Sequence, residues 1–282
     1  MAITKLVLNG TSYDLGSITY NIDTLNTLTG PEDYAGVEIA EDWANIQTAA
    51  QAGTTSTLNN GAGLRVGDYK TITTTSGTTI VCQVAGIDTY YRCGSTEQSH
   101  HVDFISKDCW PTTVVWNEST TEPGNNGTSD TTNPFMASYV YSYLEDVIYA
   151  DLPSDLTAVI AQKQLYAETR YSSSGLISDS TGVAWITMPH LWLPTEYEVF
   201  GSTILGTQGY SARDAVQYPI FANNWYHRIK GSSNGGGRCN WWLATPYFGG
   251  SAGALGVHNG GFVNSYPVTY ATARVPVCFR VC

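Results

Sequence analysis

Three polar residues in the segment SHHVDF are of types that bind metal ions, namely His100, His101 and Asp103. The apolar residues around them predict a strand, and successive side chains of a strand point to opposite faces. His101 and Asp103 therefore share a face, whereas His100 lies on the other. Because no third ligand accompanies this pair, we expect no metal site. We expect His101 to be a hydrogen-bonded structural residue, and we expect no cofactor.

Two further patterns contain the residue types of hydrolase sites. GSSNG, residues 231–235, fits G-x-S-x-G, but a nucleophilic serine of that kind needs a strand before it and a helix after it. The segment lies in a glycine-rich loop, so we attribute the match to chance. The segment TEYE supplies Glu196 and Glu198, which lie about 200° apart on a helix and would not flank one substrate bond. A helix-capping role after Thr195 is expected instead.

The cysteines offer little sign of a scaffold or a zinc site. They are Cys82, Cys93, Cys109, Cys239, Cys278 and Cys282. None forms a C-x-x-C pair, and six cysteines in 282 residues do not amount to a disulfide framework. Buried free thiols that act as small apolar side chains are the main expectation. One or two disulfides remain an alternative.

Composition and charge exclude several classes of function. The chain is 42% hydrophobic but only 13% charged, with a formal net charge of −11. Thirteen basic residues against 24 acidic ones do not make a phosphate-binding surface, so we expect no nucleic-acid partner. No apolar run is long enough to span a membrane, and the first residues lack the apolar core of a signal peptide. We therefore expect no membrane insertion and synthesis in a bacterial cytoplasm without a signal peptide.

The N-terminal region reads as a separable appendage. Residues 1–20 alternate apolar and polar side chains around Asn9-Gly10, which predicts a hairpin. A helix is predicted over residues 36–51, with its acidic first half at the positive end of the helix dipole. We expect residues 1–54 to serve in attachment or oligomerisation and residues 55–282 to form the main domain.

Residues 55–282 mix strand and helix patterns. The expected elements are a hairpin over 66–88 that turns at Ser76-Gly77, a strand pair over 100–116, a helix with an apolar stripe of Met136, Tyr139, Tyr143, Leu144 and Val147, and a second helix over 152–166. Strands and loops follow to the end. This order predicts an α+β domain with two helices, short antiparallel strands and long irregular loops.

Several segments resemble known families. LWLPTEYEVFG, residues 191–201, resembles the LPTEAEWE segment of formylglycine-generating-enzyme-like proteins, and RVPVCFRV, residues 274–281, resembles their closing strand. In order along the chain, VGDY, QVAGID, HHVDFISKDC, NPF, LWLPTEYEVFG, QYPIF, RIKG, WWLATP and VPVCFRV together resemble a domain family of unknown function from phages and prophages of gut bacteria. This resemblance covers roughly residues 55–282. It implies a C-type-lectin-like fold, which also occurs in receptor-binding proteins diversified by retroelements.

A long stretch near the C-terminus is rich in aromatic residues and free of charge. No Asp, Glu, Lys or Arg occurs between Cys239 and Ala273. NWWLATP predicts a buried strand in which Trp241 and Trp242 face opposite sides, one of them in the core and the other under a loop or at the surface. The following loops have the Tyr, Ser, Gly and Asn composition of a paratope, and aromatic faces also suit sugar rings. The expected ligand-binding residues are Trp242, Tyr247, Phe248, His258, Asn259, Phe262, Asn264, Tyr266 and Tyr270. The alternative is that these aromatics stabilise the domain's own loops.

The resemblance and the composition together predict a non-catalytic virion protein, a phage tail or head fibre. Its lectin-like domain would bind a bacterial surface glycan or protein receptor, and its first segment would bind other virion proteins. A homo-oligomer is expected, with a trimer favoured. Diversification of the loops by a retroelement is a further hypothesis.

Two alternatives stay open. One is a free secreted or prophage-encoded lectin; calcium-dependent binding is not expected, because Glu122–Gly124 and Trp116–Glu118 depart from the calcium-lectin triplets. The other is a copper-dependent oxidase of the formylglycine class, which would use Cys278 and Cys282, with Cys239 nearby.

Overall fold

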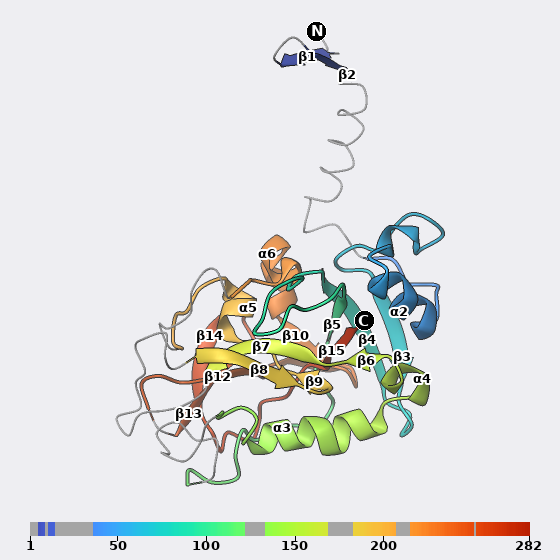
Figure 1. Ribbon diagram of the computed structural model, residues 1–282. Coiled ribbons are helices and arrows are strands. Elements are labelled where there is room, and N and C mark those ends of the chain that lie inside the picture. The colour runs from blue at the N-terminus through green and yellow to red at the C-terminus, as the bar shows by residue number, and fades with distance from the viewer. Residues whose placement is uncertain are drawn as a thin grey trace. The chain divides into compact units, whose positions relative to one another are not determined.

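The computed structural model describes residues 36–121, 133–168, 183–206, 215–250 and 252–282, apart from the side chain at position 223, and the backbone of residues 5–8 and 11–14 (Figure 1). The chain divides into two units, Met1–Ala35 and Gly36–Cys282. In the first unit, strands β1 (Lys5–Leu8) and β2 (Thr11–Asp14) pair antiparallel. This pairing confirms the predicted hairpin, whose turn residues lie outside the described ones.

The second unit begins earlier than the predicted main domain, which was placed from residue 55. It includes helix α2 (Trp43–Gln51), because Trp43 packs edge-on against Phe104 and Phe279 of the central sheet. The helix also begins later than expected. Asp42 is its N-cap and accepts a hydrogen bond from the Asn45 amide at 2.8 Å. The acidic residues before Asp42 thus precede the helix instead of forming its first turns.

A mixed set of helices and antiparallel strands forms the second unit, which is the α+β class that the sequence predicted. Its central sheet has the order β3-β4-β5-β15-β6, with β9 also paired to β15. These strands are β3 (Tyr69–Thr73), β4 (Thr79–Ile87), β5 (Val102–Ser106), β6 (Ile160–Ala161), β9 (Leu191–Trp192) and β15 (Cys278–Val281). The predicted β3–β4 hairpin is confirmed, and the last strand of the chain lies in the middle of the sheet.

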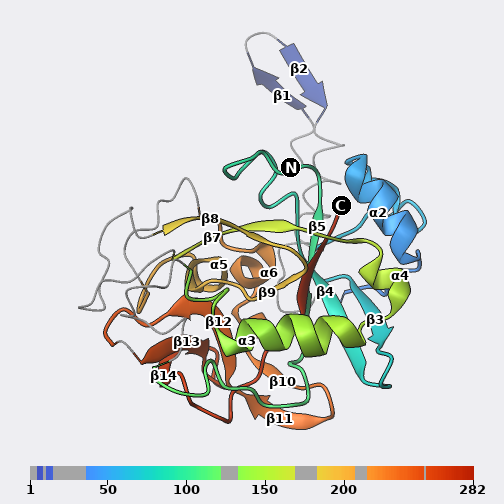
Figure 2. The ribbon, with the colours of Figure 1, turned by 60° about the horizontal axis from the view of Figure 1, so that its bottom comes forward.

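The other described strands of the second unit form three smaller sheets (Figure 2). They are β7 (Lys163–Glu168) with β8 (Val183–Met188), β10 (Lys230–Ser232) with β11 (Gly236–Cys239), and β12 (Trp241–Pro246) with β13 (Gly253–Val257) and β14 (Val263–Pro267). The strand pair expected over 100–116 is wrong in its second half. Only β5 is a strand there, and residues 110 and 114 instead donate single backbone hydrogen bonds to Val275 and Ala273.

The helix predicted after Pro134 is present, but its buried side is not the predicted one. Helix α3 (Tyr139–Tyr143) continues as the π-helical segment η2 (Leu144–Tyr149). Val140, Leu144 and Ile148, spaced by four, are buried together with Tyr141. Of the predicted stripe, Met136, Tyr139 and Val147 are 37%, 38% and 43% exposed. The tyrosines of this segment fit the helical period as well as the aliphatic residues do. The sequence pattern therefore placed the apolar stripe on the wrong side of the helix.

The second predicted helix, over 152–166, is wrong for most of its length. Only Ser154–Thr157 is helical, as α4, and the chain then forms β6 and β7. Strand β7 pairs with β8 along its whole length, from Lys163 opposite Met188 to Glu168 opposite Val183. Pairing with a distant segment therefore overrode the local preference for helix.

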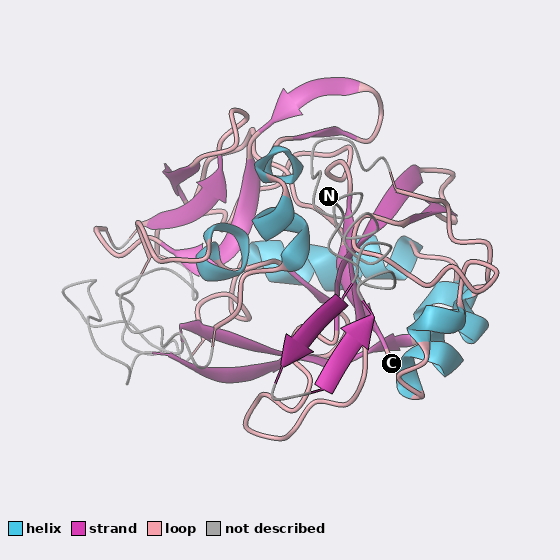
Figure 3. Cartoon of the chain, turned by 90° about the horizontal axis from the view of Figure 1, so that it is seen from above, coloured by secondary structure: helices cyan, strands magenta, loops and turns pink. Residues whose placement is uncertain are grey.

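Short helical turns fill the space between the sheets. They are η1 (Thr55–Thr57), α5 (Glu196–Phe200), α6 (Pro219–Asn223) and η4 (Trp225–Arg228). Helices α5 and α6 contact each other, and the view from above shows short helices between two groups of strands (Figure 3). Thr195 and Glu198 form a reciprocal capping box at the start of α5, which confirms the capping role predicted for this segment. No helix among the described residues is long and apolar enough to cross a membrane.

Candidate functional site

The three-stranded sheet β12–β13–β14 positions most of the predicted binding residues. Trp242 is opposite Gly256 on β13, and Gly256 is opposite Asn264 on β14. Because opposed residues of antiparallel strands share a face, and residues two apart do so too, five of the candidates belong to one face. They are Trp242, His258, Phe262, Asn264 and Tyr266. Trp241 faces the other way, as the sequence predicted.

The hairpin tip between β13 and β14 is held by several hydrogen bonds. The His258 amide donates to the Phe262 carbonyl and the Gly261 amide to the His258 carbonyl, both at 2.8 Å. The Asn259 amide donates to Asn240 Oδ1 at 2.9 Å. The imidazole of His258 stacks on the ring of Phe262, with centroids 4.3 Å apart. The tip therefore presents its two rings in a fixed geometry.

A second exposed aromatic pair lies beside this tip. Its residues were not among the binding residues predicted from the sequence. Trp225 and Tyr226 stack on each other at 4.0 Å in the 3-10 turn η4. The place where a Cβ would stand on Gly261 is 3.7 Å from Trp225 Cε3. The adjacent aromatic residues in FANNWYHRIKG were a signal that could have been used. Asn224 caps the turn by accepting from the Tyr226 amide at 2.8 Å.

We call these four residues, Trp225, Tyr226, His258 and Phe262, the aromatic tip. Trp225 is 48%, Tyr226 50% and Phe262 54% exposed, although large apolar side chains usually contribute to a core. Surfaces that recognise ligands are rich in rigid aromatic side chains that stay exposed side by side. Chemically, the arrangement offers aromatic faces to the C–H groups of a sugar ring.

Beneath the tip is a layer of buried aromatics. Trp242, expected among the binding residues, is 0% exposed and donates from Nε1 to the Val114 carbonyl at 2.8 Å. It therefore supports the site from below, and its assignment as a contact residue is corrected. Tyr266 is 8% exposed and stacks on Tyr270 at 4.7 Å. Asn240 Nδ2 donates to the Tyr270 hydroxyl at 3.0 Å, so Asn240 links this layer to the tip.

The remaining candidates do not join the tip. Tyr247 and Phe248 follow the end of β12, where Pro246 is opposite Ala254 near the start of β13. The tip lies beyond the other end of β13, so the two groups are roughly a strand length apart, about 15 Å. The ring of Tyr247 lies against its own glycine loop, and Phe248 donates its amide to the Leu205 carbonyl at 3.2 Å. Asn264 is half-buried within the sheet.

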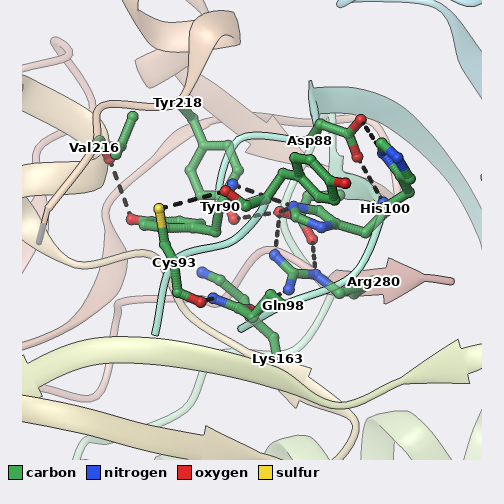
Figure 4. Close-up of polar contacts among 12 residues, drawn as sticks. Asp88, Tyr90, Cys93, Gln98, His100, Lys163, Val216, Tyr218 and Arg280 are labelled. Carbon is green, nitrogen blue, oxygen red and sulfur yellow. Dashed lines mark hydrogen bonds and ion pairs between the residues drawn. The ribbon is translucent and has the colours of Figure 1, made fainter. Parts of the chain in front are cut away.

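His101 and Asp103 belong to a buried polar network, and Figure 4 labels their partners Tyr90, Tyr218 and Arg280. Asp103 accepts from Arg280 Nε at 2.7 Å and Nη2 at 2.8 Å, and from the Tyr218 hydroxyl at 2.8 Å. His101 Nδ1 contacts the Ser99 carbonyl at 2.7 Å, while Nε2 accepts from the Tyr90 amide at 3.3 Å. Burial lowers the pKa of His101. Across the described ranges, no three His, Cys, Asp or Glu side chains are grouped for a metal ion.

A second buried ion pair adjoins this network. Lys163 Nζ is 2.6 Å from Glu198 Oε1 and 3.7 Å from the centroid of the Trp192 ring. The Tyr90 hydroxyl also donates to Glu198 Oε1 at 2.9 Å. Burial lowers the pKa of Lys163, against the opposing effect of Glu198. Because these groups are already paired with one another, the network reads as a structural core.

Arg280 and Gln98 also line a polar pocket of about 280 Å³ together with Gln164, Thr187 and Cys282. The guanidinium of Arg280 donates to Asp103 and to Gln98. Its hydrogen-bonding groups thus serve the network, and the other lining residues of the pocket include the acidic Glu97 beside neutral polar side chains.

The cysteines are free thiols in the described structure; three are buried as expected (Cys82, Cys109 and Cys278), and three are only partly buried (Cys93, Cys239 and Cys282). Cys278 is buried in β15, and Cys282 comes four residues later along an extended chain, about 13 Å away. That spacing does not place both thiols on one copper ion. Cys239 contacts Cys109 instead, and its hydrogen bond with Cys109 lowers the pKa of Cys239. The GSSNG segment comprises the end of β10 and the turn to β11, a strand–turn–strand that lacks the helix of a nucleophile elbow.

Comparison with known families gives one result. A family described as a domain of unknown function (DUF6273) matches residues 111–281, more than half of the chain. The chain belongs to the DUF6273 family. The DUF6273 segment contains the whole aromatic tip and its supporting layer, whereas strands β3, β4 and β5 of the central sheet precede it. Searches among curated proteins and among solved structures gave no match.

Proposed function

We propose that this chain is a non-catalytic recognition protein of a phage particle and that its aromatic tip binds a glycan on the bacterial surface. The observation that carries the proposal is the pair of exposed aromatic stacks at the tip. Trp225, Tyr226 and Phe262 each expose about half of their surface, although burial of a large aromatic side chain would contribute roughly 2–3 kcal/mol. A ligand that covers these three side chains when it binds accounts for their position outside the core.

The tip is also organised before any ligand arrives. Asn240 and the backbone bonds between His258 and Phe262 hold the hairpin, and Asn224 holds η4. A site whose side chains are already ordered loses less conformational entropy on binding, which favours affinity for a weakly interacting ligand such as a sugar. The charge-free stretch from Cys239 to Ala273 also suits a ligand with many hydroxyl groups.

The resemblance to the phage and prophage domain family supports a C-type-lectin-like fold and the virion setting. Two of the segments that carry it have defined places in the fold. LWLPTEYEVFG forms β9 and the capping box of α5, and VPVCFRV contains β15. In this proposal the first unit attaches the protein to other virion proteins, and the assembled form is a homo-oligomer. A free lectin that uses the same tip is the second candidate.

Binding to cells tests the proposal. The purified protein would be incubated with a panel of gut-bacterial strains and the bound fraction measured by flow cytometry, beside a variant with Trp225, Tyr226 and Phe262 changed to Ala. Tyr139→Ala, which removes a 38% exposed tyrosine on α3, is the matched control. Strain-selective binding that the triple variant loses and Y139A keeps is expected. Binding that the triple variant keeps would refute the role of the tip.

Membership of a particle needs a separate measurement. Mass spectrometry of purified particles from an induced producing strain would contain peptides of this chain if it is a virion protein. Peptides found only in the soluble fraction would favour the free lectin.

A further inference from the structure

Charge is divided unevenly along the chain. Residues 1–199 contain 23 of the 24 acidic residues, and residues 200–282 contain only Asp214 against six of the thirteen basic residues. In a protein of net charge −11, the part that contains the aromatic tip is therefore locally cationic. Asp214 lies outside the described residues.

Two of the six basic residues have structural roles in the interior. Arg280 is paired with Asp103, and the buried ammonium of Lys230 donates to the carbonyls of Ser106 and Lys107. Neither cation is directed to the surface. Of the other four, Arg213 lies outside the described residues, so Arg228, Arg238 and Arg274 are the described cations of residues 200–282 that an external ligand can approach.

The backbones of these three arginines lie close to the start of β12, the end of the strand that is next to the tip. The Arg228 carbonyl accepts from Trp241 Nε1 at 2.8 Å. The amide of Arg274 donates to the Asn240 carbonyl at 2.9 Å. Arg238 lies on β11, two residues before Asn240. Asn240 in turn holds Asn259 of the tip.

No ion pair joins any of these three arginines to a carboxylate within the described ranges. The Arg228 guanidinium lies 4.8 Å from the centroid of the Phe200 ring, and burial alone lowers its pKa. Arg274 donates to the Pro111 carbonyl, and Arg238 is exposed. Asp108 is the acidic residue of this region, and its carboxylate accepts from the Gly231 amide at 2.9 Å.

Arg228 is well placed to act together with the aromatic tip. Residues three apart in a 3-10 helix lie on the same side, about 6 Å apart along the axis, so Arg228 and Trp225 share a side of η4. The neighbouring His227 has its pKa lowered to about 4, first by burial and then by Lys230 and Lys107. His227 is therefore neutral at pH 7, and the positive charge of the turn belongs to Arg228.

We propose that the ligand of the aromatic tip is an anionic glycan, whose sugar rings contact the aromatic faces and whose carboxylate or phosphate groups contact Arg228 and Arg238. This inference rests on the proposed function and specifies its ligand class. Guanidinium groups bind both anions through paired hydrogen bonds. The acidic remainder of the protein would repel the same polymer, which orients the domain with its tip toward the cell surface.

The test uses cells of the panel strain that binds most strongly. Their carboxylates would be converted to neutral amides with carbodiimide and methylamine, and in a separate sample their phosphodiesters would be removed with hydrofluoric acid. Binding of the intact protein would be measured on treated and untreated cells at low and moderate salt. The double variant R228Q/R238Q would be compared with R92Q, which removes an exposed arginine of the acidic half.

We expect one of the two treatments to reduce binding, which identifies the anion, and R228Q/R238Q to weaken binding at least about fivefold. R92Q should bind like the intact protein, and added salt should weaken the intact protein more than the double variant. Binding that survives both treatments and is unchanged in R228Q/R238Q, while the aromatic triple variant loses it, would overturn the anionic ligand and leave the proposed function standing. Binding to no strain would overturn both.

Discussion

Replacing Arg280 with Met would expose the energetic role of the buried polar network. The change removes the two hydrogen bonds to Asp103, at 2.7 and 2.8 Å, and the one to Gln98, but keeps an apolar side chain of similar length. Asp103 would remain fully buried with the Tyr218 hydroxyl as its main partner. Leaving one member of such a pair uncompensated costs about 3–5 kcal/mol. For a unit of this size that corresponds to a fall in melting temperature of about 10 °C.

The pH dependence follows from the pKa of Asp103. Burial raises this pKa, but the charges and hydrogen bonds of Arg280, with His101, outweigh burial and hold it well below its usual range. A depressed pKa in the folded state contributes stability above the unfolded pKa of about 3.9, and this contribution disappears only as pH falls through the lower folded value. In R280M the effect of burial would no longer be opposed by Arg280 and the Asp103 pKa would rise, so the stability lost relative to the intact protein should be larger at pH 7 than at pH 5.

Urea unfolding followed by tryptophan fluorescence would measure the free energy of unfolding lost in R280M and how that loss depends on pH. The control is R92M, in which an exposed guanidinium stacked 5.0 Å from the Tyr91 centroid is removed at a cost of about 1 kcal/mol or less. The double variant D103N/R280M should recover part of the loss, because no buried charge is left unpaired. A loss below about 1 kcal/mol in R280M, or a loss equal at the two pH values, would refute this account.

Three further changes test the support of the tip and the state of the thiols. Asn240→Ala removes two hydrogen bonds that hold the tip, so cell binding should weaken about tenfold. The circular dichroism spectrum should stay native. Unchanged affinity would argue against a tip that is ordered before the ligand binds. Gly261→Ala places a Cβ at φ +88° and 3.0 Å from Ile229 Cγ1, and should destabilise the fold by about 1–2 kcal/mol in thermal unfolding; a neutral result would contradict the described backbone. Cys239 is half-buried, whereas Cys82 is fully buried and burial raises its pKa. Alkylation of the native protein at pH 8, followed by peptide mapping, should therefore label Cys239 before Cys82. Equal labelling of the two thiols would contradict this difference.

Local sequence signals predicted the parts of the fold in which local and distant interactions agree. The β3–β4 hairpin has β-branched strands and a Ser-Gly turn, and Thr195 with Glu198 has the spacing of a capping box. Residues 160–166 were predicted as helix because Ala, Gln, Lys and Leu there favour that structure, whereas pairing with β8 decides the structure. The partner strand lies beyond an intervening segment, so no local pattern could indicate it.

The candidate site was predicted only in part for a similar reason. The composition of the charge-free stretch pointed to His258 and Phe262 of the aromatic tip, and to Asn259 in the hairpin turn between them. It could not show that Trp242 is covered by Trp116, 6.0 Å away between centroids and 126 residues earlier in the chain. Nor could it show that Trp225 reaches Gly261, since that contact depends on how η4 packs beside the hairpin.

The most direct test of the central claim is a set of binding isotherms on the surface polysaccharide purified from the best-bound strain. Single alanine variants at Trp225, Tyr226 and Phe262 would be compared with Tyr247→Ala, which lies at the other end of β13. The account predicts about a tenfold or greater loss at each of the first three and intact affinity for Y247A. Loss at Tyr247 with full affinity at the other three would contradict it and would move the binding face to the opposite end of the sheet.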